Sequence, residues 1–251
     1  MTERANILIT GASSGLGAGM AREFAARGRN LALCARRVEN LERLRTELLD
    51  AHPEITVAIA RLDVNDHDDV FAVFERLSRQ LGGVHRVIVN AGISHGRPVG
   101  TGGFAANRAI AETNFVAALA QCEAAMEIFR GRGDGHLVVV SSIAALRGMP
   151  GFQAYSASKA AVATLAEAIR ADTLATPINV TTLYPGFIES ELGVADHKPP
   201  FRVSTEKGVR AMVHAIEAER ARAAVPPWPW APIGFALPRL PLRLLAKLGQ
   251  R

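Results

Sequence analysis

Short runs of aliphatic and β-branched residues alternate along the chain with longer segments in which apolar positions recur every three or four residues. The short runs predict strands, and the longer segments predict helices with one apolar face. We expect strands near residues 5–10, 30–35, 56–61, 86–90, 136–141 and 179–183. We expect helices near residues 16–27, 38–51, 66–81, 104–129, 155–174 and 205–219. This alternation is typical of βαβ units, which build a parallel sheet.

The strand runs also indicate which parallel architecture to expect. Runs such as VIVN and LVVVSS are apolar at consecutive positions, as in a sheet covered by helices on both faces. A closed barrel would need eight βα units, more than the sequence offers. We therefore predict an α/β fold, a doubly wound parallel sheet in a single domain over residues 1–225, followed by a tail over residues 226–251. Ligands of such sheets bind beyond the carboxyl ends of the strands.

Composition narrows the class of protein. The chain has 251 residues, of which 49% are hydrophobic and 21% charged, which is typical of a globular protein and excludes intrinsic disorder. Two cysteines, Cys34 and Cys122, cannot form a disulfide framework, and we expect a cytoplasmic protein. The start of the chain lacks the apolar core of a signal peptide, and the longest uncharged run, residues 223–238, holds five prolines. No membrane-spanning helix is predicted.

The formal net charge of +5 is concentrated in the tail. The tail has no acidic residue, and its four basic residues recur at every fourth position: Arg239, Arg243, Lys247 and Arg251. Leu240, Leu244 and Leu248 form an adjoining apolar stripe, so a terminal helix would be basic and apolar on neighbouring faces. Such a helix either lies on an anionic membrane surface or packs on its own subunit or a partner near the substrate entrance. The remaining chain is nearly neutral, which gives no indication of a nucleic-acid partner.

A glycine-rich turn follows the first predicted strand and opens into a helix. Its residues are Gly11, Ser13, Ser14, Gly15, Leu16 and Gly17. Glycines allow the backbone to approach a pyrophosphate closely, and the free N–H groups of a helix N-terminus favour its negative charge. An ordinary strand-to-helix turn is the alternative, and the place between first strand and first helix favours the nucleotide site.

The end of the second predicted strand indicates which dinucleotide would bind. Proteins that use NAD usually carry an acidic residue there, about 20 residues after the glycines, to bind the ribose 2′-hydroxyl. This chain has Arg36 and Arg37 instead. Arginine offers planar, charged hydrogen bonds to phosphate oxygens, so the pair predicts NADP(H) in preference to NAD(H).

A tyrosine and a lysine lie one helical turn apart after the fifth predicted strand. Tyr155 and Lys159 are at positions i and i+4 and share one face of the predicted helix. A nearby ammonium favours the phenolate and would bring the phenol into a useful range for proton transfer. Ser142, at the carboxyl end of the fifth strand, would hold a substrate oxygen beside Tyr155.

Taken together, these motifs resemble the classical short-chain dehydrogenase/reductase family over about residues 5–225. The resemblance rests on Thr10, Gly11, Gly15, Gly17, Asn90, Ala91, Gly92, Asn114, Ser142, Tyr155, Lys159, Pro185 and Gly186, in the same order and at similar spacings. It implies a single Rossmann-type domain that transfers hydride between NAD(P) and a carbonyl or alcohol.

The resemblance also implies a role for each catalytic candidate. Tyr155 would be the general acid/base, and Lys159 would lower its pKa and bind the nicotinamide ribose. Ser142 would orient the substrate carbonyl. Asn114 would hold a water that links Lys159 to a proton relay.

Further positions correspond to the family's cofactor contacts. Asp63 and Val64 would flank the adenine, while Asn90, Ala91 and Gly92 would line the cofactor and steady the sheet.

The nicotinamide contacts would follow the sixth strand. Pro185, Gly186 and the backbone of Ile188 match these contacts, and Ser190 stands where many members have threonine. Arg36 falls where members that prefer NADP carry a basic residue.

Several alternatives were weighed against this function. The seven histidines show no metal-ligand spacing, and no G-x-S-x-G nucleophile turn of a hydrolase is present. The Pro- and Trp-rich tail differs from the segment that builds the common tetramer of the family, so we expect a homodimer through the helices 104–129 and 155–174. A nucleotide-binding sensor or scaffold that acts through its tail remains the competing function. We expect an NADP(H)-dependent enzyme for an apolar carbonyl or secondary alcohol, with specificity set by residues 143–153 and 186–202.

Overall fold

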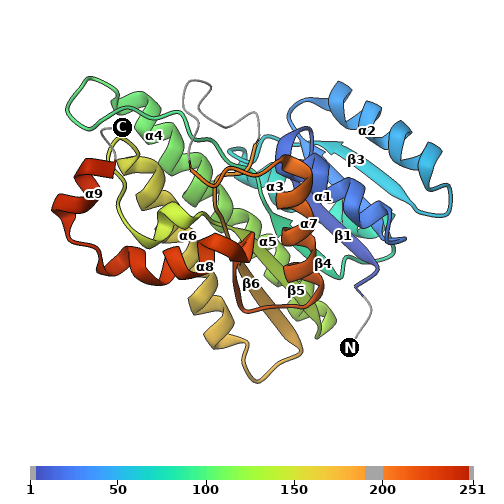
Figure 1. The fold of residues 1–251 in the computed structure, drawn as a ribbon. Helices are drawn as coiled ribbons and strands as arrows, with labels where there is room; N and C mark the ends of the chain where they lie inside the picture. Colours follow the sequence, from blue (N-terminus) through green and yellow to red (C-terminus); the bar gives the residue numbers. More distant parts are fainter. Residues whose placement is uncertain (1–3, 190–199, 249–251) are drawn as a thin grey trace.

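The computed structural model describes residues 4–189 and 200–248, and it contains one parallel sheet (Figure 1). The seven strands stand in the order β3-β2-β1-β4-β5-β6-β7. Their bounds are β1 Asn6–Thr10, β2 Asn30–Ala35, β3 Val57–Arg61, β4 Arg86–Val89, β5 Gly135–Val140, β6 Ile178–Pro185 and β7 Arg222–Val225. The predicted doubly wound sheet is confirmed. The seventh strand was not predicted, because its four residues, RAAV, are too short and too small to stand out as an apolar run.

Helices cover both faces of the sheet. One face packs against α1 (Gly15–Ala25), α2 (Val38–Ala51) and α7 (Thr205–Glu217), and the other against α3 (His67–Gln80), α5 (Ala117–Arg132) and α6 (Gln153–Asp172). Within β1, Ile7 and Ile9 belong to the first core and Leu8 to the second. Because successive side chains of a strand point to opposite faces, continuous apolar strands are needed to fill both cores.

The long helix predicted over residues 104–129 is interrupted. The structure has α4 (Phe104–Ala111), a π-helical turn η1 (Glu112–Val116) and then α5. The π turn is only five residues long, which is too short to stand out in the apolar pattern of the surrounding helix. Such turns often lie at functional sites, and this one contains the buried Asn114.

The tail folds into three short elements. These are α8 (Pro227–Ala236), the 3-10 turn η3 (Leu237–Arg239) and α9 (Leu242–Leu248). The predicted continuous helix through Arg239 and Arg243 is wrong, because Leu240 has an extended backbone ahead of Pro241, and a residue before proline disfavours the helical region. Arg251 lies outside the described residues. The tail packs on its own subunit, with Trp230, Leu237 and Leu245 buried.

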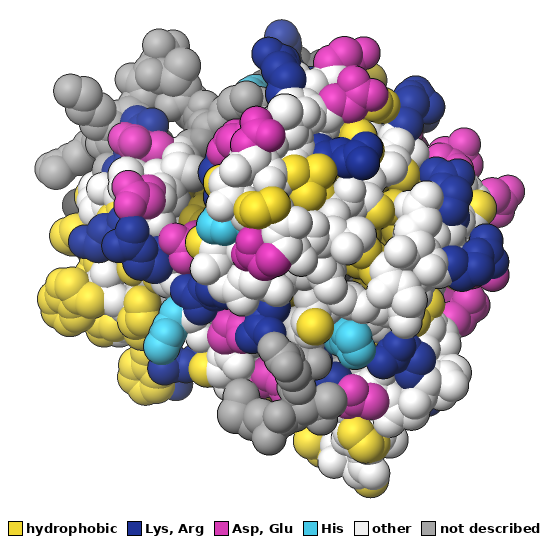
Figure 2. Space-filling view, turned by 90° about the vertical axis from the view of Figure 1, so that its right-hand side faces the viewer, with side chains coloured by type: hydrophobic (Ala, Val, Ile, Leu, Met, Phe, Trp, Pro, Cys, Tyr) yellow, Lys and Arg dark blue, Asp and Glu magenta, His cyan; other side chains and the backbone are white. Residues whose placement is uncertain are grey.

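Charge is mixed on the face that Figure 2 shows, where Lys and Arg stand next to Asp and Glu. This agrees with the nearly neutral count for the chain before the tail. Within residues 4–189 and 200–248, no helix combines the length and the apolar character needed to cross a membrane.

A buried network of charged and polar side chains connects the amino-terminal ends of the central strands. Arg86 at the start of β4 donates to Glu217 (2.7 Å) and to Nδ1 of His136 (2.8 Å), whose other ring nitrogen lies 2.8 Å from the Thr181 hydroxyl. Burial, followed by the charge of Arg86, lowers the pKa of His136 well below its usual value, so the ring is neutral. The network pairs its charges at the edge opposite to the predicted ligand site, which indicates a structural role.

Candidate active site

The switch in strand order between β1 and β4 places the glycine-rich turn beside the end of β4. Gly11 has a φ of +64°, and a Cβ there would lie 2.9 Å from the Cα of Ala91. A Cβ on Gly17 would lie 2.3 Å from the carbonyl oxygen of Gly11 and 2.8 Å from Nδ2 of Asn90. The two glycines are therefore required for a close approach between the turn and β4.

Hydrogen bonds fix this contact. The Thr10 hydroxyl accepts from the backbone N–H groups of Asn90 (3.0 Å) and Ala91 (3.1 Å). The side-chain amide of Asn90 donates to the carbonyl oxygen of Thr10 (2.9 Å). The turn and the Asn90 segment thus form one rigid unit at the carboxyl edge of the sheet.

The two arginines after β2 have different surroundings. Arg37 donates from Nε to the Ser13 hydroxyl (3.3 Å) and from Nη2 to the Ser14 hydroxyl (2.5 Å), which brings together three of the residues predicted to bind phosphate. Arg36 is exposed beside them and has no hydrogen bond or ion pair with any described residue. One guanidinium therefore holds the turn, while the other is available to a ligand.

The loop after β3 contacts the π turn. Asp63 accepts from the backbone N–H of Asn65 (3.1 Å), and the Asn65 side chain donates to the Thr113 hydroxyl (3.2 Å) in η1. Val64 is buried next to them. Asp63 and Val64 thus border the same edge as the glycine-rich turn, whereas the link to Thr113 had no signal in the sequence.

Ser142 and Tyr155 meet where β5 and α6 come together. Ser142 caps the 3-10 turn η2 (Ile143–Leu146) by accepting from the N–H of Ala144 (3.2 Å). Its hydroxyl also acts on the Tyr155 phenol, whose pKa it lowers. Ser142 is buried and Tyr155 half-buried, so the pair of hydroxyls lies at the boundary of the protein interior.

Lys159 is the buried cation of the site. Its Nζ donates to the carbonyl oxygen of Val140 (2.9 Å) and lies 6.0 Å from the centre of the Tyr155 ring. The Ser141 hydroxyl donates to the Lys159 carbonyl oxygen (2.7 Å) and ties α6 to β5. Burial lowers the pKa of Lys159 to about 8.

The pKa of Tyr155 differs from the sequence-based expectation. We expected the cation of Lys159 to lower it, but burial raises the pKa of Tyr155, and the Ser142 side chain only opposes this rise. Desolvation of the phenolate thus outweighs the stabilising contacts. In this arrangement the phenol is a protonated donor at neutral pH.

Asn114 is fully engaged with its surroundings. Its Oδ1 accepts from the N–H of Ile93 (2.8 Å), and its Nδ2 donates to the carbonyl oxygen of Ile93 (2.8 Å) and to the Ser158 hydroxyl (3.2 Å). A Cβ on Gly92 would lie 3.1 Å from Oδ1 of Asn114 and 3.5 Å from Nζ of Lys159, so the two polar groups converge beside Gly92.

The segment after β6 packs against the tail. A Cβ on Gly186 would lie 2.1 Å from the indole of Trp230, and the Trp230 ring meets Phe187 edge-on at 5.3 Å. Ile188 pairs with Val203 as an isolated bridge, which closes the base of the following loop. Ser190 lies outside the described residues. The contact between Gly186 and the tail has no signal in the sequence, because no periodic pattern surrounds Trp230.

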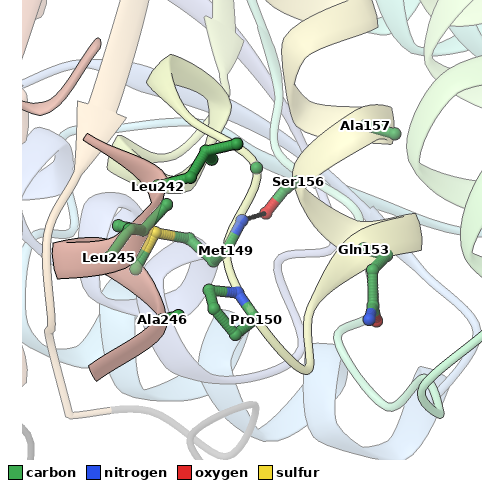
Figure 3. A pocket seen from close by; sticks show the side chains of 9 residues that line it. Met149, Pro150, Gln153, Ser156, Ala157, Leu242, Leu245 and Ala246 are labelled. Carbon is green, nitrogen blue, oxygen red and sulfur yellow. Dashed lines mark hydrogen bonds between the residues drawn. The ribbon is translucent and has the colours of Figure 1, made fainter. Parts of the chain in front are cut away.

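An apolar cavity of about 500 Å³ lies between the loop before α6 and helix α9 (Figure 3). Leu242, Leu245 and Ala246 of α9 face Met149 and Pro150 of the loop. The first turn of α6 completes the wall with Gln153, Ser156 and Ala157, next in sequence to Tyr155. Its apolar lining fits a hydrophobic group.

Metal and thiol chemistry find no support in the described part of the chain. No three His, Cys, Asp or Glu side chains there are grouped as metal ligands. Cys34 and Cys122 are free and buried, and burial raises the pKa of each thiol to about 12. Neither is suited to act as a nucleophile.

Comparison with known proteins agrees with this geometry. The model of the family described as short chain dehydrogenase matches residues 5–199. The chain belongs to this family. It is thus an oxidoreductase that acts on CH–OH and C=O groups. It is 54% identical over 247 residues, 98% of both chains, to an uncharacterized oxidoreductase of Mycobacterium tuberculosis. It is also 38% identical over 220 residues, 87% of this chain and 86% of the relative, to one of Myxococcus xanthus.

Solved structures of short-chain dehydrogenases share the fold. A short-chain dehydrogenase from Sphingobium yanoikuyae in complex with NADPH has a TM-score of 0.82 and 26% identity, and covers 96% of this chain and 95% of its own. One from Burkholderia phymatum in complex with NAD has a TM-score of 0.83 and 22% identity, with 98% and 96% covered. These relatives carry either nicotinamide cofactor, so they leave the choice between NAD and NADP to this chain's own residues.

Proposed function

We propose that this chain is an NADP(H)-dependent oxidoreductase that transfers a hydride between NADPH and the carbonyl or secondary alcohol of an apolar small molecule. The observation that carries the proposal is the convergence of Ser142, Tyr155, Lys159 and Asn114 at the carboxyl edge of the sheet, next to a glycine-rich turn. The hydroxyls of Ser142 and Tyr155 would together bind one substrate oxygen.

The residues at this edge fit a dinucleotide. Gly11 and Gly17 leave no room for a side chain, and the N-terminus of α1 offers free N–H groups to a pyrophosphate. The residues that would hold the cofactor are Gly11, Ser13, Ser14, Gly15, Leu16, Gly17, Arg36, Arg37, Asp63, Val64, Asn90, Ala91, Gly92, Tyr155, Lys159, Pro185, Gly186, Ile188 and Ser190. When bound, NADPH supplies the hydride.

The preference for NADPH rests on Arg36. Its exposed guanidinium stands beside Ser13 and Ser14, which Arg37 already holds in place. No acidic residue follows β2 at this point to repel a phosphate or bind a ribose hydroxyl. A 2′-phosphate would thus bind the Arg36 guanidinium next to a turn that Arg37 holds in place.

Side chains of the protein would supply the proton that the substrate oxygen gains. Tyr155, with its raised pKa, is protonated at neutral pH and donates to the substrate oxygen, while Ser142 holds that oxygen in place. Lys159 binds the nicotinamide ribose and supports the phenolate that remains. Asn114, anchored on Ile93 and close to Lys159, positions the route by which the proton is replaced.

The apolar cavity beside α6 supports a hydrophobic substrate. It adjoins the turn that carries Tyr155, and Gly148, Met149 and Pro150 of the loop before α6 line it. We assign the recognition of an apolar substituent to this cavity, and the orientation of the reacting oxygen to the hydroxyl pair.

Three further assignments complete the proposal. We keep residues 1–225 as the catalytic domain and residues 226–251 as its tail, in a cytoplasmic protein with reduced thiols. A homodimer would form through α4, α5 and α6, where Phe104, Val116 and Leu119 expose apolar side chains. The mixed charges outside the tail do not favour a nucleic-acid partner.

The direct test is a screen of ketones and secondary alcohols of increasing apolar size, following the absorbance of NADPH. We expect turnover with apolar carbonyl compounds by the natural chain and none by Tyr155→Phe. The competing function, a nucleotide-binding sensor or scaffold, predicts NADPH binding without turnover of any compound and equal behaviour of the two proteins.

A further inference from the structure

The tail exposes apolar side chains on its outer side although it already buries others. Trp230, Leu237 and Leu245 pack inward. Three large apolar side chains that do not line the cavity are open to solvent, with exposed fractions from 50% to 79%: Trp228, Phe235 and Leu244. A surface helix normally turns polar residues outward. An outer side of this composition indicates an interaction surface.

Cations stand among these apolar groups. The guanidinium of Arg239 lies 4.3 Å from the centre of the Phe235 ring and donates to the Phe235 carbonyl oxygen (2.6 Å). The positive charge is therefore held beside an exposed aromatic ring. Arg243 is exposed four residues later in the sequence, at the start of α9.

No negative charge balances them, since residues 226–251 contain neither Asp nor Glu. In Figure 1, α8 and α9 follow each other along the outside of the molecule, at the end away from α2 and β3. A flat membrane could therefore approach α8 and α9 from outside the molecule.

We propose that five residues of the tail form a membrane-binding surface that docks on an anionic lipid bilayer. We call these residues the tail patch: Trp228, Phe235, Arg239, Arg243 and Leu244. Tryptophan, phenylalanine and leucine enter the boundary between headgroups and acyl chains, and arginines beside them pair with lipid phosphates. The chain lies on the bilayer and does not cross it.

Charge argues against a second copy of the chain as the occupant. A two-fold symmetric contact through the tail patch would bring Arg239 and Arg243 of both copies together. With no acidic residue in the segment, these charges would repel each other. An anionic bilayer instead supplies the opposite charge and an apolar layer in one surface.

The test is co-sedimentation of the full chain with vesicles of phosphatidylcholine and phosphatidylglycerol in equal parts, compared with phosphatidylcholine alone. We expect binding to the anionic vesicles only, weakening as sodium chloride is added, because salt screens the attraction. Arg239→Gln/Arg243→Gln should weaken binding by about 30-fold, since each cation near an anionic surface contributes about fivefold. Phe235→Ser/Leu244→Ser should abolish it.

Matched controls carry the same changes elsewhere. Arg45→Gln/Arg76→Gln removes two exposed charges from α2 and α3, and Leu174→Ser removes a leucine that is more exposed than Leu244 (80% against 50%). Both should bind like the natural chain. NADPH affinity and the melting temperature of each variant, measured in solution, should stay unchanged, which separates this proposal from that of the active site.

Two outcomes would overturn the proposal. One is that the natural chain does not bind anionic vesicles. If the tail-patch variants then dissociate a dimer, the patch contacts a second copy of the chain and not a membrane. The other is equal loss of binding in the Arg45→Gln/Arg76→Gln control, which would mean that overall charge and not the tail patch is responsible.

Discussion

The indole of Trp230 occupies the space next to the Cα of Gly186 in which a side chain would otherwise stand. A Cβ on Gly186 would lie between 2.1 and 2.4 Å from three atoms of the indole. Trp230 belongs to the tail, while Gly186 follows the strand that leads to the nicotinamide contacts proposed above. The tail therefore acts as the back wall of the site, although it lies outside the matched family region.

Gly186→Ala should destabilise the fold through this contact. We expect a loss of about 1–3 kcal/mol in the free energy of unfolding, as for other overpacked interiors, together with weaker NADPH binding. In a Trp230→Leu background the same change should cost much less, because the indole is gone. Urea unfolding of the four proteins in this double-mutant cycle measures the coupling. Equal costs in both backgrounds would show that the two residues do not interact.

Arg36→Asp should weaken NADPH binding far more than NADH binding. The lost charged hydrogen bonds to the 2′-phosphate correspond to at least about tenfold in affinity. Arg45→Asp, on the exposed side of α2, provides a control of identical charge change. Fluorescence titration with both cofactors gives the dissociation constants. If NADPH and NADH lose affinity equally, Arg36 does not select the cofactor.

Lys159→Met should abolish turnover and yet raise stability at pH 7. Burial brings the pKa of Lys159 from its usual value of 10.5 down to about 8, so below pH 8 the folded protein bears a buried charge that costs about 3 kcal/mol. Loss of the hydrogen bond to Val140 offsets about 1 kcal/mol of the gain.

The pH dependence follows from the direction of that shift. Between pH 8 and pH 10.5 the folded lysine is neutral while the unfolded chain still binds a proton, so the natural protein gains stability as pH rises. The advantage of Lys159→Met should therefore shrink across this window. Thermal melts in a pH series measure it, and a constant difference would contradict the burial of a charged lysine.

Ala246→Phe should narrow the apolar cavity beside α6. Ala246 lines the cavity, so the larger ring takes part of its volume of about 500 Å³. We expect a higher KM for carbonyl compounds with long apolar substituents and no change for short ones. Ala236→Phe, an exposed position of α8 that does not line the cavity, is the control. A uniform effect on long and short compounds would place substrate recognition elsewhere.

Sequence alone predicted the sheet and the meeting of the site residues for physical reasons. Continuous apolar strands require helices on both faces, and parallel strands bring their carboxyl ends to one edge. The glycine-rich turn, Asn90 and Ser142 each follow a strand, so their convergence could be foreseen from chain order. Tyr155 and Lys159 share a helical face at any i, i+4 spacing.

Other features depend on packing between distant segments. The π turn around Asn114 leaves no trace in the apolar pattern, and the contact of Trp230 with Gly186 joins residues whose spacing has no period. The direction of the Tyr155 pKa shift was predicted incorrectly, because a charge partner can be read from a motif while the extent of desolvation cannot. The tail was expected as one basic helix, whereas Pro241 divides it.

Tyr155→Phe tests the central claim most directly. Turnover of the best carbonyl substrate and the dissociation constant of NADPH should be measured on the same preparation. We predict that turnover falls at least about 100-fold, through loss of the proton donor, while NADPH binds nearly as before. Residual turnover near that of the natural chain, accompanied by loss of NADPH binding, would contradict the assignment of Tyr155 as the general acid.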